Sequence, residues 1–113
     1  MFSDKVRKAF QTELSNGERA RLAGFEGRAR VCARRAAGEA AREYLRLAGT
    51  QQNGSAVVLL GMLVEMEGVT PRAREAAAHL LTRVDEGFNL AEGVDLLEEA
   101  RTLAIELERL EEL

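Results

Sequence analysis

Residues 25 to 48 read FEGRARVCARRAAGEAAREYLRLA, and this stretch constrains the fold more than any other segment. It lacks proline and is dominated by alanine and arginine, which lose little entropy in a helix. It therefore predicts a helix about 36 Å long, which Gly49 ends. Small side chains on one face let a neighbouring backbone approach, so we expect this helix at the centre of a bundle. That face holds Phe25, Ala29, Cys32 or Ala33, Ala36, Ala40, Tyr44 and Leu47.

The two ends of the chain also predict helices. The first begins after Ser3 or Asp4, either of which can cap free backbone N–H groups, and 15–17 (Ser-Asn-Gly) is expected to break or bend it. A possible capping box formed by Asn89 and Glu92 precedes the last helix. Leucines and an alanine then alternate at spacings of four and three, which is typical of a bundle seam. These residues are Leu96, Ala100, Leu103, Leu107, Leu110 and Leu113.

Two shorter helices are predicted in the middle of the chain. Ser55 can cap a helix over 56–67 that is apolar nearly all round. Thr70 and Pro71 mark the start of the next, with proline at the first helical position, where its missing N–H costs nothing. The sequence therefore predicts an all-α protein with no sheet: a single domain over 1–113, folded as a four- or five-helix up-and-down bundle.

Charge and cysteine usage limit the classes of function. Residues 1–49 carry a net charge of +5 and residues 50–113 carry −8, which favours pairing of the two halves and leaves a basic face for anions. Cys32 is the only cysteine, so we expect a reduced cytoplasmic thiol, no metal site and no cofactor. The apolar run at 56–64 is about half a membrane span, so no membrane association is expected.

Arginines line the face of the long helix opposite its small residues. A charge run of this kind is typical either of a solvated face or of a footprint for anions or RNA. We take the face as the candidate binding surface. It holds Arg28, Arg35, Arg42 and Arg46, with Arg30 and Arg34 alongside.

The order of elements resembles the small prokaryotic HEPN domains, which are nucleotide-binding helical bundles. The resemblance covers roughly residues 20–110 and is carried by the long second helix, the short apolar third helix and the proline-started fourth. Its local parts are 34–40 (RRAAGEA), similar to a stretch of the family's central helix, and Arg83 with Asp85 and Phe88, similar to its arginine, acidic and aromatic stretch before the last helix. The resemblance adds Arg83 and Asp85 to the candidate binding residues.

The resemblance implies a homodimer, often bound to a minimal nucleotidyltransferase. Some HEPN domains are metal-independent ribonucleases with an R-x4-6-H motif, which Arg72 or Arg74 with His79 would match here. Within one helix neither arginine reaches the histidine, so a second subunit would have to complete such a site. Glu75 beside Arg74 departs from the active pattern and would repel a phosphate.

His79 also has a simpler interpretation. It lies away from the inner stripe of its helix, so we expect it at the surface with Glu75 as its i,i+4 partner. We therefore expect a non-catalytic bundle that associates with itself, with a nucleotidyltransferase-like partner, or with a nucleotide or RNA. The alternatives are a ribonuclease that uses Arg72, Arg74 and His79, and a scaffold dimer without a ligand.

Overall fold

The structure is a computed structural model that describes residues 2–50, 53–82 and 93–112. Within these residues the chain is helical and has no strand, which confirms the predicted all-α bundle. None of the described helices combines the length and the apolar character needed to cross a bilayer. The helices are α1 (Asp4–Leu22), α2 (Glu26–Leu47), α3 (Ala56–Glu65), α4 (Pro71–Leu81) and α5 (Leu96–Glu111).

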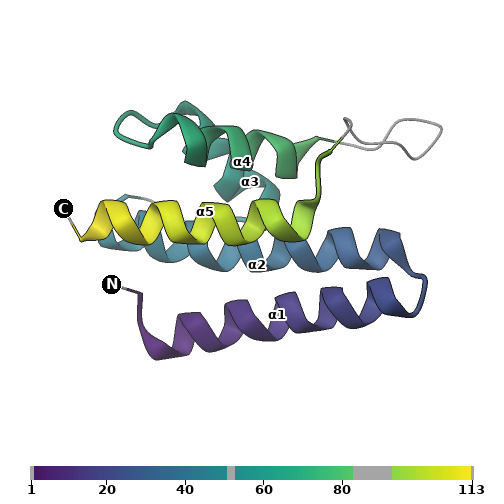
Figure 1. The fold of residues 1–113 in the computed structure, drawn as a ribbon. Helices are drawn as coiled ribbons and strands as arrows, with labels where there is room; N and C mark the ends of the chain where they lie inside the picture. The colour runs from purple at the N-terminus through teal and green to yellow at the C-terminus, as the bar shows by residue number, and fades with distance from the viewer. Residues whose placement is uncertain (1, 51–52, 83–92, 113) are drawn as a thin grey trace.

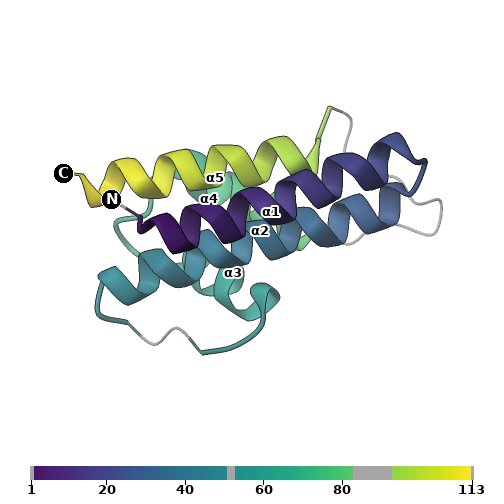
Figure 2. The same cartoon turned by 90° about the horizontal axis from the view of Figure 1, so that it is seen from below.

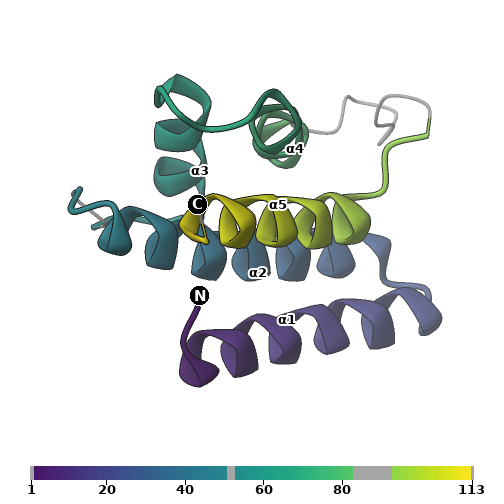
Figure 3. The ribbon, with the colours of Figure 1, turned by 60° about the vertical axis from the view of Figure 1, so that its left-hand side comes forward.

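The helices form three layers. α2 and α5 lie side by side in the middle layer, α1 covers one side of it, and α3 and α4 cover the other (Figures 1 and 3). Figure 2 shows α1, α2 and α5 running lengthwise together, and Figure 3 shows α3 standing at a steep angle to α2 and α5. α2 packs against each of the other four helices, as its small residues predict.

The core joins the alanine face of α2 to leucines of its neighbours. Ala36 and Ala40 are at most 1% exposed, and Leu103 and Leu107 of α5 and Leu80 of α4 are fully buried. Because an alanine side chain is short, the leucines fill the space above it. Phe25 and Leu47, predicted on this inner face, are instead 56% and 38% exposed. They lie at the two ends of α2, where fewer neighbours cover the helix.

The predicted break at 15–17 is absent, because α1 continues through these residues to Leu22. Gly17 is buried where α1, α2 and α5 meet. A Cβ atom built there would lie 2.7 Å from Leu97 Cδ2, 3.1 Å from Cys32 Cβ and 3.3 Å from the carbonyl oxygen of Ala29. The glycine therefore serves close approach of helices rather than a turn.

Side-chain caps mark the starts of α1, α3, α4 and α5, whereas α2 has none. Ser3 accepts from the Val6 amide at α1, and Thr70 accepts from the Ala73 amide at α4, with Pro71 following it as predicted. At α5 the cap is Asp95, which accepts from two amides of the first turn. The predicted capping box of Asn89 and Glu92 lies outside the described residues.

Ion pairs tie the first helix to the last. Arg7 pairs with Glu108 near the chain termini, and Glu18 pairs with Arg101 farther along. At the other end of α1, Arg21 Nη1 lies 2.9 Å from Asp95 Oδ2. These pairs run antiparallel along the two helices, which otherwise touch little.

Candidate functional site

The arginines predicted as a binding surface share one face of α2. Arg28, Arg35 and Arg46 are exposed and Arg42 is half-buried. The two nearer the C-terminus are engaged locally: Arg46 Nε lies 2.6 Å from Glu43 Oε1, and Arg42 Nη1 lies 3.7 Å from Glu39 Oε1. Neither Arg28 nor Arg35 has an ion-pair partner in the described part of the chain. The arginines nearer the start of α2 are therefore the ones whose positive charge no acidic partner offsets in the described residues.

A hollow of about 690 Å³ lies between α1 and α2 beside these two arginines. Arg19 of α1 joins Arg28 and Arg35 in lining it. Glu13 is its only acidic lining residue, so the hollow carries an excess of positive charge. Packing of α1 on α2 thus adds a third arginine to two that the sequence had grouped.

Apolar side chains share the hollow with the arginines. Phe25 is 56% exposed and Val31 is 43% exposed, and both line it. The guanidinium carbon of Arg28 lies 5.3 Å from the centroid of the Phe25 ring, within range of a cation–π interaction. The turn between α1 and α2 places the ring there, since Phe25 precedes the first residue of α2.

Arg34, predicted beside the binding face, points inward instead. Its Nε donates to the carbonyl oxygen of Leu80 at 2.7 Å and its Nη2 to that of Thr82 at 3.0 Å. Burial, and then the charge of neighbouring Arg30, lower the pKa of Arg34. These carbonyls belong to the C-terminal end of α4, where the helix leaves acceptors without partners. Arg34 therefore has a structural role, because its hydrogen bonds hold the end of α4 against α2.

The three residues of the R-x4-6-H motif face three different partners. Arg72 Nη1 bonds to Glu75 Oε1 at 3.0 Å at the surface. Arg74 Nη2 donates to the carbonyl oxygens of Met66 at 2.9 Å and Val69 at 3.4 Å, so it holds the turn between α3 and α4. The structure of one chain does not bring these arginines together with the histidine.

His79 differs from the expectation of a surface residue paired with Glu75. Its Nδ1 lies 3.2 Å from Glu99 Oε2 on α5, and the two side chains are 32% and 12% exposed. The expected partner is lost because Glu75 pairs with Arg72 and because α5 covers this flank of α4. Neither of these two atoms makes a hydrogen bond in the described residues.

Arg83 and Asp85, the remaining candidate binding residues, lie outside the described residues. The sequence interpretation missed Arg19, because its position on the hollow depends on how α1 packs, and missed Phe25 by placing it in the core. One local signal indicated that Phe25 lies at a turn rather than in the core. Gly24, immediately before it, has a φ of 87° and ends the first helix. No group of three or more metal-ligating side chains occurs in the described parts of the chain.

Comparisons of the chain with models of protein families, with curated proteins and with solved structures find no match.

Proposed function

We propose that the protein is a non-catalytic binding module that holds single-stranded RNA in the hollow between α1 and α2. The observation that carries the proposal is the grouping of Arg19, Arg28 and Arg35 around the exposed ring of Phe25. Modules that bind single strands combine basic side chains for the phosphates with aromatic rings on which bases stack.

In this proposal each group has a separate task. Arg28 and Arg35, seven residues apart on one helix face, lie about 10 Å from each other along the axis, so they contact different phosphates. Arg19 approaches from α1 and adds a third contact. A base stacks on the ring of Phe25, with Val31 giving apolar contact beside it. This arrangement does not select one base strongly, because every base has a stacking face.

Arg42 and Arg46 extend the same line of α2 but have a smaller part. Glu39 and Glu43 already offset their charges. A longer strand would follow the line toward them and gain a weaker, salt-sensitive attraction. This length favours an oligonucleotide over a single nucleotide.

The proposal also includes a distant relation to HEPN domains. It is supported by the order of the helices, with a long central α2, a short apolar α3, an α4 that begins with proline and a final acidic α5. Self-association and a nucleotidyltransferase-like partner remain parts of this proposal, and a co-purification screen combined with light scattering would test both.

RNA binding is tested by fluorescence anisotropy of a labelled uridine oligomer at two salt concentrations. Three phosphate contacts give a slope of log K against log salt of about −2, since each contact on a single strand contributes about −0.7. Reversing charge with Arg28→Glu and Arg35→Glu together should remove most of this slope and weaken binding. Phe25→Ala should weaken binding by at least about fivefold, the lower range for one stacked base.

Arg109→Glu is the matched control. Arg109 is 74% exposed on α5 and lies 3.9 Å from Glu106, so this variant makes the net-charge change of Arg28→Glu alone at a position away from the hollow. Equal affinities for Arg109→Glu and for Arg28→Glu alone would show that only total charge matters. That result, or no binding to the unmodified protein, would refute the RNA-binding site.

A further inference from the structure

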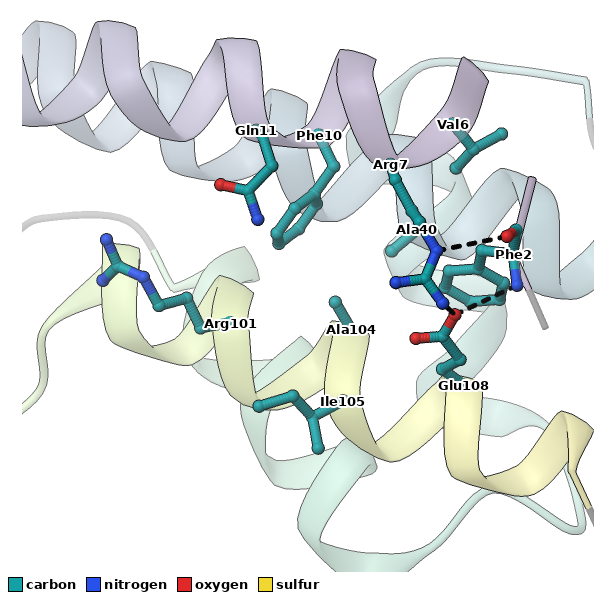
Figure 4. A pocket seen from close by; sticks show the side chains of 10 residues that line it. All are labelled: Phe2, Val6, Arg7, Phe10, Gln11, Ala40, Arg101, Ala104, Ile105 and Glu108. Atoms are coloured by element: carbon teal, nitrogen blue, oxygen red, sulfur yellow. Dashed lines mark hydrogen bonds and ion pairs between the residues drawn. The ribbon is translucent and has the colours of Figure 1, made fainter. Parts of the chain in front are cut away.

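A second cavity lies between α1 and α5. It is a slot of about 470 Å³ with apolar walls, formed by Val6 and Phe10 of α1 and by Ala104 and Ile105 of α5 (Figure 4). Ala40 of α2 lies at its floor. Its size is within the range of small-molecule sites, which are mainly apolar with a few polar groups.

The slot exists because charged pairs hold the two helices together at its ends while small residues line its middle. Arg7 pairs with Glu108 at one end, and Glu18 pairs with Arg101 at the other. Between these pairs Ala40 and Ala104 are too short to fill the space. Ile105 at the rim is 54% exposed, an apolar side chain that a bound molecule would cover.

Two hydrogen-bond donors from α1 face the slot. Arg7 and Gln11, one helical turn apart, both point toward it in Figure 4. Arg7 uses Nε for the Phe2 carbonyl and Nη2 for Glu108, whereas Nη1 has no hydrogen bond in the described residues. The side-chain amide of Gln11, the residue after Phe10, likewise has no hydrogen bond in the described residues.

We propose that this slot binds a small amphipathic carboxylate. The apolar body lies between Phe10, Ala104 and Ile105, and the head accepts from Arg7 Nη1 and the Gln11 amide. An acceptor head fits because both groups donate, and a charged head fits best because hydrogen bonds to an ionised group are the stronger ones. A cationic head is disfavoured because two arginines, Arg7 and Arg101, line the slot, and because the one lining carboxylate, Glu108, already pairs with Arg7 and accepts from the Phe2 amide.

The slot and the RNA hollow share no lining residue. A variant in one therefore leaves the other intact, and the carboxylate proposal stands or falls independently of RNA binding.

Octanoate is a suitable probe, with octylammonium as the comparison of equal length and opposite charge. Titration followed by amide NMR should show one site, with shifts at Gln11, Ala104 and Ile105, and should show tighter binding of octanoate. Octylammonium binding as tightly as octanoate, or an absence of octanoate binding, would overturn the proposal.

Two variants test the body and the head separately. Ala104→Phe fills the slot from α5 and should abolish octanoate binding. Gln11→Glu places a carboxylate where the ligand's head would lie and should weaken octanoate binding by about tenfold. Thr12→Glu adds the same charge at an exposed position that does not line the slot and should leave affinity unchanged.

If Ala104→Phe retains its helical circular dichroism and still binds octanoate, the proposed site is wrong. A twofold fall in mass by light scattering in Ala104→Phe would also refute it, since a second copy of the chain would then be the occupant. Gln11→Glu keeps the test decisive where Ala104→Phe fails to fold, because Gln11 is exposed and its replacement leaves the core unchanged.

Discussion

The Nδ1 atom of His79 lies 3.2 Å from the Oε2 atom of Glu99, which joins α4 to the first turn of α5. Because Glu99 is only 12% exposed, the pair should contribute to the packing of these helices. We expect a double-mutant cycle with His79→Gln and Glu99→Gln to give a coupling of about 0.5–1 kcal/mol by urea unfolding. The exposed pair of Arg72 and Glu75 is the control and should give less.

The same contacts lead us to expect no ribonuclease activity. Arg74 is bound to backbone carbonyls and His79 faces a carboxylate, so neither side chain is set to act on a ribose. Incubation of labelled RNA with the protein in EDTA should give no more cleavage than buffer. Cleavage that disappears in His79→Ala, with unchanged circular dichroism, would restore the ribonuclease alternative.

Glu43 should make stability depend on acid pH. A hydrogen bond from Arg46 lowers the pKa of this buried carboxyl, burial opposes the shift, and the Ser3 amide at 3.4 Å adds to the lowering. A carboxyl with a lowered pKa in the folded state contributes stability above its unfolded pKa of about 4.3, and that contribution is lost as pH falls through the folded pKa.

Glu43→Gln tests this contribution. The variant should have a lower free energy of unfolding than the unmodified protein at pH 7, and the difference should narrow as pH falls below about 4. Glu39→Gln, on the same helix but half-exposed, should change the free energy at pH 7 by less than about 0.5 kcal/mol. If the difference in unfolding free energy between Glu43→Gln and the unmodified protein widened toward acid pH, the stabilising role of ionised Glu43 would be contradicted.

Gly17 and Gly61 should respond in opposite directions to alanine. Alanine favours a helix over glycine by up to about 1 kcal/mol at both positions. At Gly17 a Cβ atom would lie 2.7 Å from Leu97 and 3.3 Å from a backbone oxygen, so we expect a lower melting temperature. At Gly61 of α3 no atom lies within 4 Å of an added Cβ, so we expect Gly61→Ala to have a higher melting temperature. Stabilisation by Gly17→Ala would mean that the helices separate easily there.

Asp95 combines a helix cap with an ion pair, and two variants separate them. Asp95→Asn keeps an oxygen for the amides of Leu97 and Glu98 but loses the charge that pairs with Arg21. Asp95→Ala loses both and should cost about 1 kcal/mol more in unfolding free energy, the usual value of a cap. Equal losses in the two variants would show that the cap contributes nothing.

Local signals in the sequence predicted the helices well. Thr70 with Pro71 marked the start of α4, and Gly49, with a φ of 74°, marked the end of α2. These signals depend on backbone preferences of a few neighbouring residues, so they need no knowledge of the rest of the fold. The prediction of a break at Gly17 was wrong for the same reason. This glycine is needed for close contact with α2 and α5, which a local signal does not show.

The candidate site was less predictable because it depends on which helix flank a neighbour covers. Arg34 and Arg35 are adjacent in sequence, yet Arg34 bonds to the end of α4 and Arg35 is exposed. The helical period separates them by about 100°, which is enough to place one in an interface and the other in water. The sequence could group the arginines of α2, but it could not show that Arg19 of α1 joins them.

The ion pairs between α1 and α5 also bear on synthesis of the chain at the ribosome, which proceeds from the N-terminus. α1 emerges before α5, yet Arg7, Glu18 and Arg21 find their partners on α5 or at its cap. The nascent chain can pair α1 with α2 early, but closing the bundle must wait until α5 has been synthesised.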